Sequence, residues 1–136
     1  MLKKIILALV MALCAVSFTV EAAPAKTAAI KVTQATREGT AKAFFKAVFL
    51  NKDYNAAWNL MSPAAKAGYV KEHGSEAKAK AAFKALIQKE SKRFPPDMLQ
   101  MLKDEMQLDV LVRMSVKKMK ANDMVKIKGK WYINNL

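Results

Sequence analysis

Hydrophobic residues recur at helical spacing in the segment that follows residue 35. The first such pattern begins at Thr36, a residue type that often caps helices, and ends near Asn51. Its large apolar residues fall on one side of the helix, and Lys42 and Lys46 fall on the other. The pattern therefore predicts an amphipathic helix with one buried face.

Four further helices are indicated by capping residues and prolines. Each combines an apolar stripe at helical spacing with polar residues on the remaining surface. The fourth helix of the chain is expected to end near Lys92, because the Pro95-Pro96 pair that follows cannot continue a helix. The predicted starts of the four helices are Asp53, Ser62, Ser75 and Pro96.

The hydrophobic period changes from about 3.6 to 2 near Gln107. Apolar and polar residues alternate over residues 108–116, which predicts a half-buried strand. Two shorter strands are predicted after a turn at Asn122-Asp123, and Ile127 should lie opposite Trp131 if their apolar residues share one face. The predicted fold class is α+β, with N-terminal helices followed by a three-stranded antiparallel sheet, or a four-stranded one.

Several short stretches resemble a known family. The sequences AFFKA at 43–47, KDYNAA at 52–57 and LMSP at 60–63 resemble the opening helical hairpin of small secreted NTF2-like domains of the lumazine-binding-like type. The closing VKIKGKWYI at 125–133 is similar to their terminal β-hairpin. The resemblance implies a cystatin-like fold, in which a curved sheet wraps around helices and forms a cone with an apolar pocket. The chain stops directly after the strand with Trp131, so a second copy could be needed to close that pocket.

The N-terminal residues have the pattern of a cleaved signal peptide. Lys3 and Lys4 precede an apolar run over residues 5–20, and small residues surround Ala22. The run is shorter than the roughly 20 apolar residues that a membrane-spanning helix needs. We therefore expect cleavage near Ala22 and a periplasmic or secreted mature protein.

The remaining chain is divided into a flexible lead over residues 23–35 and a single domain over residues 36–136. Cleavage of residues 1–22 removes Cys14, the only cysteine. The mature protein is therefore expected to form no disulfide and no thiolate site. His73, the only histidine, is interpreted as an exposed loop residue, and too few ligands remain for a structural zinc site.

No catalytic motif or cofactor signature is found in the sequence, and no metal site is predicted. Aromatic residues could line an apolar pocket in the predicted cone, although most aromatic residues in such a domain are expected to belong to the core. A small pocket enzyme of the isomerase or lyase type is the alternative, and it would need a buried ionisable side chain with a perturbed pKa. The candidate pocket residues are Phe45, Trp58, Tyr69 and Trp131.

The chain is strongly basic, with a net charge of +13. Part of this charge is concentrated near the C-terminus in Lys117, Lys118, Lys120, Lys126, Lys128 and Lys130. These lysines could form a solvated face or could bind an anionic component of the envelope, such as phospholipid or a polyanion. Nucleic acid is disfavoured because arginine is scarce and aromatic residues do not alternate with the lysines. The sequence thus predicts an exported, non-catalytic binding or interaction module for an apolar ligand or a protein partner, with a homodimer left open.

Overall fold

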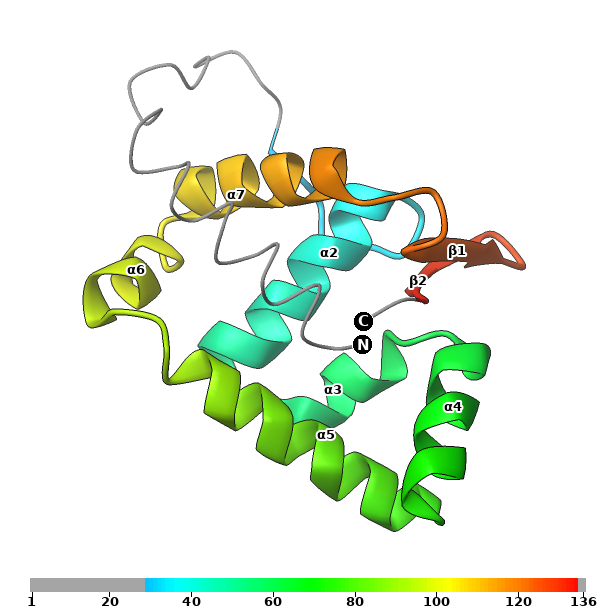
Figure 1. Ribbon diagram of the computed structural model, residues 1–136. Helices are drawn as coiled ribbons and strands as arrows, with labels where there is room; N and C mark the ends of the chain where they lie inside the picture. The colour runs from blue at the N-terminus through cyan, green and yellow to red at the C-terminus, as the bar shows by residue number, and fades with distance from the viewer. Residues whose placement is uncertain (1–28, 135–136) are drawn as a thin grey trace.

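The computed structural model describes residues 29–134, and the predicted signal peptide and residues 23–28 of the predicted lead lie outside them. Within the described residues, the chain forms six α-helices, a π-helical turn and one β-hairpin. Figure 1 shows α7 lying across α2, with the hairpin beside them and α3, α4 and α5 on the opposite side of α2. The helical elements are α2 (Arg37–Phe45), η2 (Lys46–Leu50), α3 (Tyr54–Asn59), α4 (Pro63–His73), α5 (Glu76–Ser91), α6 (Pro96–Met101) and α7 (Glu105–Lys118), and the strands are β1 (Met124–Ile127) and β2 (Lys130–Ile133).

The five helices predicted before residue 102 are confirmed: predicted capping residues begin the first four, and the fifth begins at Pro96 as predicted. The Thr36 side chain accepts a hydrogen bond from the Gly39 N–H at 3.0 Å. Asp53, Ser62 and Ser75 cap α3, α4 and α5 in the same way. Each cap satisfies a backbone N–H that has no partner inside its helix, and this fixes where the helix begins.

The predicted strand over residues 108–116 is wrong, because these residues form most of α7. Residues 29–134 therefore form a two-stranded sheet and not the three- or four-stranded sheet of the predicted α+β fold. The curved sheet implied by the NTF2-like resemblance is absent from the described residues. The architecture is mainly helical, with a hairpin attached to one end (Figure 1).

The sequence of α7 fits two periods at once, which explains the wrong prediction. Leu108, Leu111, Val112 and Val116 are spaced as on one helical face, and all four are buried. Asp109, which the alternating pattern placed on a solvent-facing side, is buried as well. The helix also has its own start signal, since the Asp104 side chain accepts hydrogen bonds from the N–H groups of Met106 and Gln107.

The two C-terminal strands are confirmed, but their predicted register is wrong by one residue. Ile127 pairs with Lys130, and Lys126 pairs with Trp131. The two-residue turn causes this register, because Lys128 and Gly129 both have positive φ (50° and 81°), as in a type I′ hairpin turn. Consequently Val125 and Ile127 lie on the face opposite to Trp131 and Ile133.

Strand β2 is hydrogen-bonded along both edges. β1 occupies one edge, and the Trp131 N–H donates to the Gln34 carbonyl at 2.7 Å on the other. On that second edge the Ile133 N–H donates to the Leu60 carbonyl at 2.8 Å, and the Ser62 N–H donates to the Ile133 carbonyl at 2.7 Å. The last strand of the described chain is thus joined to two segments from its first half.

Two aromatic groups lie in the core around α2 and α3. Phe44, Phe45, Phe49 and Phe94 form a chain of edge-on and tilted ring contacts. Trp58, Tyr69 and Phe83 form the second group, which joins α3 to α4 and α5. Within residues 29–134, no helix is both long and apolar enough to cross a membrane.

Candidate functional site

The four predicted pocket residues do not surround one cavity. Phe45 is 1% exposed and belongs to the core. Trp58 and Tyr69 are neighbours, with ring centroids 6.0 Å apart, whereas Trp131 lies in β2 and packs under the guanidinium of Arg37 at 5.6 Å. Among these four residues, Trp58 alone lines the cavity of about 360 Å³ between α3 and α5.

His73 is not a loop residue as predicted, because it ends α4 and its ring stacks on Tyr69 with a centroid distance of 5.5 Å. Burial raises the pKa of the Tyr69 hydroxyl, and the nearby Glu72 carboxylate adds to this effect. A tyrosine with a raised pKa stays neutral and does not become a base. The described residues contain no group of three His, Cys, Asp or Glu side chains that could hold a metal ion.

The six C-terminal lysines are all exposed, and we refer to them as the lysine cluster. Lys117 and Lys118 occupy the last turn of α7, Lys120 follows it, and the other three lie on the hairpin. Within residues 29–134, none of them forms an ion pair. Asp123 is the single acidic residue between residues 110 and 136, and its carboxylate accepts a hydrogen bond from the Lys120 backbone N–H at 2.8 Å.

The backbone that carries the lysine cluster is firmly held. The Asn134 N–H donates to the Asp123 carbonyl at 2.8 Å, and the Asn134 side chain donates to the Asn122 carbonyl at 3.1 Å. These bonds tie the connection between α7 and β1 to the end of β2. The lysine side chains therefore project from a fixed frame, although each side chain itself is free to move in solvent.

The hairpin also presents an apolar face. Val125, Ile127 and Tyr132 lie together on the side of the hairpin that is opposite to Met124 and Ile133. All three are half-buried and lie outside the core cluster, whereas Met124 and Ile133 are buried in it. Lys130 lies on the same face of the hairpin, opposite Ile127, whereas Lys126 lies on the other face opposite Trp131.

A group of charges that the sequence pattern did not predict to be buried lies between α2 and α7. Lys42, which was predicted to face solvent, is 3% exposed. Its ammonium lies 2.7 Å from Asp109 Oδ1 and 2.7 Å from Glu105 Oε2, and it donates to the Ile30 carbonyl at 2.8 Å. Asp109 Oδ2 accepts a hydrogen bond from the Ile30 N–H at 3.1 Å. The spacing of Lys42 from the buried Phe45 and Phe49 could have indicated its burial, because all three fall on one helical face.

These charges fasten the N-terminal segment to the helices. Ile30 offers one N–H and one carbonyl, and Asp109 and Lys42 bind both. The part of the predicted flexible lead that the structure describes, residues 29–35, is therefore attached to the domain. Burial lowers the pKa of Lys42, but its hydrogen bonds to Asp109 and Glu105 outweigh this effect, so the pKa is raised and the ammonium stays charged.

Glu105 should make the free energy of unfolding depend on pH in the acidic range. Hydrogen bonds from Lys42 and Lys46 lower the pKa of Glu105 from 4.5 to about 2. Because the folded-state pKa is depressed, the stabilisation is complete above about pH 4.5 and is lost as the pH falls toward 2. The side chain is 58% exposed, so solvent screening limits the effect to about 1 kcal/mol or less.

Urea unfolding of the wild type and of Glu105→Gln, measured at about pH 6 and pH 3, tests this expectation. The wild type should lose more free energy of unfolding than the variant across this range. Equal losses in the two proteins would show that Glu105 is not the group responsible.

Comparison with known proteins adds no family to this description, because no protein-family model, curated protein or solved structure matches the chain. Two features of the described residues bear on function: the lysine cluster with the apolar face of the hairpin, and the cavity between α3 and α5.

Proposed function

We propose that this protein is an exported, non-catalytic binding module that associates with anionic phospholipid surfaces through its C-terminal hairpin. The observation that carries the proposal is the lysine cluster, in which six exposed lysines share the end of α7 and the hairpin with a single carboxylate. Each lysine close to an anionic lipid surface contributes about 1 kcal/mol to binding. Several lysines acting together give a strong but salt-sensitive attraction.

The apolar face of the hairpin favours a membrane over a soluble polyanion. Val125, Ile127 and Tyr132 are half-buried beside Lys130, and lysines with tyrosine and aliphatic residues are suited to the boundary between lipid headgroups and acyl chains. A polyanion would use the lysines but would gain little from this apolar surface. The same combination argues against a purely solvated basic face.

The buried charges do not support the alternative of a pocket enzyme. Lys42 and Asp109 bind each other and the Ile30 backbone, and neither lines the cavity between α3 and α5. Both groups are thus used in holding the N-terminal segment. A general acid or base has to reach a substrate, and these two side chains are occupied by the fold itself.

The proposal is tested by sedimentation with lipid vesicles. The purified protein should bind vesicles that contain phosphatidylglycerol, should not bind vesicles of phosphatidylcholine alone, and should be released as salt is raised. The variant Lys126→Gln/Lys128→Gln/Lys130→Gln should bind the anionic vesicles about 100-fold more weakly, since about 1 kcal/mol is lost for each lysine.

A matched control removes the same charge from another surface. Lys78→Gln/Lys89→Gln/Lys92→Gln changes three exposed lysines in and directly after α5. This variant should keep most of the vesicle binding. Equal weakening in both variants would mean that net charge alone drives association, and binding that ignores salt or lipid charge would contradict the proposal.

A further inference from the structure

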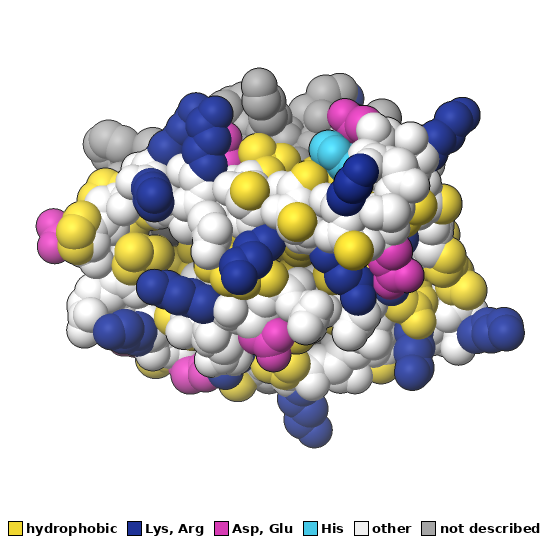
Figure 2. Space-filling view, turned by 90° about the horizontal axis from the view of Figure 1, so that it is seen from below, with side chains coloured by type: hydrophobic (Ala, Val, Ile, Leu, Met, Phe, Trp, Pro, Cys, Tyr) yellow, Lys and Arg dark blue, Asp and Glu magenta, His cyan; other side chains and the backbone are white. Residues whose placement is uncertain are grey.

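Helix α5 carries a second basic surface, separate from the lysine cluster. Along the middle of its solvent side lie the exposed Ala77, Ala81 and Ala85, and lysines lie along both borders of this strip. Figure 2 shows the molecule from the side of α5, with lysine and arginine side chains spread over that face and apolar atoms between them. We refer to the four exposed lysines in and directly after α5 as the α5 basic face: Lys78, Lys84, Lys89 and Lys92.

The carboxylates of α5 do not neutralise the α5 basic face. Glu90 is 5% exposed, and its carboxylate lies 3.1 Å from the Arg93 guanidinium. Glu76 lies 3.4 Å from Lys80, which is not one of the four lysines. Within residues 29–134, none of the four forms an ion pair. Their charge is therefore open to an external anionic surface.

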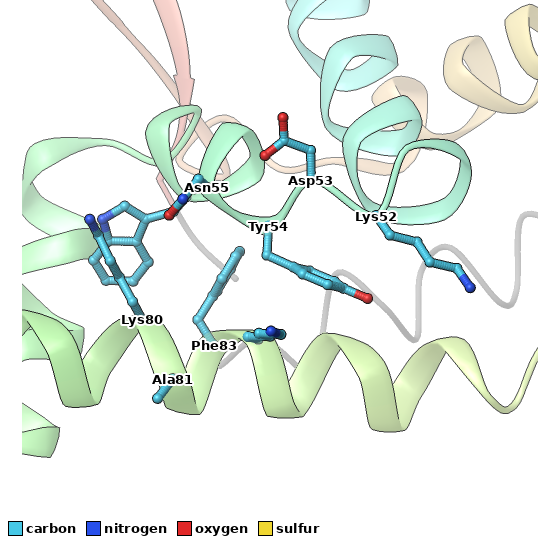
Figure 3. A pocket seen from close by; sticks show the side chains of 9 residues that line it. Lys52, Asp53, Tyr54, Asn55, Lys80, Ala81 and Phe83 are labelled. Carbon is cyan, nitrogen blue, oxygen red and sulfur yellow. The ribbon is translucent and has the colours of Figure 1, made fainter.

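The cavity between α3 and α5 extends the positive charge beyond the helix. Lys52, Lys80 and Lys84 line it, and Figure 3 shows Lys52 and Lys80 toward its opposite ends. Asp53 is the single carboxylate among the lining residues, and it is engaged as the cap of α3, where it accepts a hydrogen bond from the Ala56 N–H at 3.1 Å. The positive surface on this side of the molecule thus continues from α5 to the loop before α3.

The α5 basic face and the lysine cluster lie on different sides of the molecule. Strand β2 packs on α2, whereas α5 packs on α3 and α4. In Figure 1 the hairpin and the end of α7 lie at one end of the molecule, and α5 runs along the side away from them. A bilayer that contacts the hairpin therefore leaves the α5 basic face directed toward solvent.

From this arrangement we infer that the protein bridges two anionic phospholipid surfaces, one bound by the hairpin and the other by the α5 basic face. The inference rests on the proposed function, because the hairpin provides the first contact. Alanine side chains are short, so the lysines on the two borders of α5 can reach the same flat surface. This second contact is electrostatic and lacks the apolar residues of the hairpin, but many molecules between the same two surfaces act together, which compensates for a weak single contact.

The test places the purified protein between two lipid layers. A supported bilayer that contains phosphatidylglycerol is covered with the protein and washed, and the bound mass is followed with a quartz crystal microbalance. The protein layer should then capture added vesicles that contain phosphatidylglycerol and should not capture vesicles of phosphatidylcholine alone. Raising the salt should release the captured vesicles. The same bilayer without protein should capture neither kind.

A charge variant of α5 separates the second contact from the first. Lys78→Gln/Lys89→Gln/Lys92→Gln should still form a protein layer on the supported bilayer, because its hairpin is unchanged. This layer should capture anionic vesicles at least about tenfold less well than the wild-type layer, since three of the four lysines that attract the second surface are absent.

A matched control removes three exposed lysines that lie outside α5. Lys31→Gln/Lys71→Gln/Lys103→Gln has the same net charge as the α5 variant and should capture vesicles like the wild type. Equal loss of capture in both variants would overturn the inference, because net charge alone would then explain capture.

The remaining outcomes distinguish the two proposals. A wild-type protein that forms no layer on the first bilayer would contradict the proposed function, and the inference with it. A normal first layer that captures no vesicles would overturn the inference alone and would show that the α5 basic face is solvated or serves another partner. Capture of neutral and anionic vesicles to the same extent, or undiminished capture by the α5 variant, would also overturn it.

Discussion

Replacing Lys42 with methionine is expected to lower the free energy of unfolding by about 3–5 kcal/mol. The methionine matches the length of the lysine stem but leaves the Asp109 carboxylate buried without its cation, and leaves the Ile30 carbonyl without a donor. An unpaired buried charge is far more costly than an absent one. Urea unfolding followed by circular dichroism measures the change, and the loss is large compared with the stability of about 5–15 kcal/mol that is typical of a domain.

Two companion variants make this result interpretable. Lys46→Met removes a lysine that lies one turn away and also pairs with Glu105, but this pair is solvent-exposed and should contribute at most about 1 kcal/mol. The double variant Lys42→Met/Asp109→Leu removes both buried charges and should recover part of the loss seen in Lys42→Met. Equal effects of Lys42→Met and Lys46→Met, or a double variant less stable than Lys42→Met, would contradict the structural account of the buried pair.

Gly39→Ala is expected to destabilise the protein by about 1–3 kcal/mol, although alanine is a better helix former than glycine. The N-terminal segment crosses α2 at Gly39, so a methyl group there would lie 2.7 Å from the Lys31 carbonyl oxygen and nearer still to that of Thr33. Both obstructing atoms belong to the backbone and cannot move aside as a flexible side chain could. Thermal and urea unfolding of the variant measure the loss.

Gly68→Ala is the matched control for this prediction. Gly68 lies within α4, and a methyl group at this position would meet no atom within 4 Å. The substitution should therefore stabilise the protein by up to about 1 kcal/mol through helix propensity alone. If both alanine variants were stabilised, the close crossing of the N-terminal segment over α2 would not exist in solution.

The helices could be predicted from the sequence because their start signals are local. Thr36, Asp53, Ser62 and Ser75 each accept a hydrogen bond from the N–H group three residues further along, so a short stretch of sequence contains the whole signal. The α7 segment could not be assigned in this way. Its apolar residues fit both periods, and Asp109 belongs on the buried face because of two distant partners, the Lys42 ammonium and the Ile30 N–H.

The two candidate sites also differ in how far they could be predicted from the sequence alone. The exposure of the lysine cluster follows from the chemistry of lysine, which rarely enters a core. The cavity between α3 and α5 depends on a tertiary contact, because Tyr54 and Lys84 are far apart in the sequence and meet only when the two helices pack. The register of the hairpin was missed because the two-residue turn, with positive φ at Lys128, overrides the apolar pattern of the strands.

The position of β2 has a consequence for the order in which the protein can fold. Its two-sided hydrogen bonding closes loops back to Gln34 and to residues 60–62, which lie far earlier in the sequence. During synthesis, those partners leave the ribosome long before Trp131 and Ile133 do. Contacts of such large sequence separation form slowly, because the entropy of loop closure has to be overcome first. Closure of the fold therefore has to wait until residues 131–133 have been synthesised.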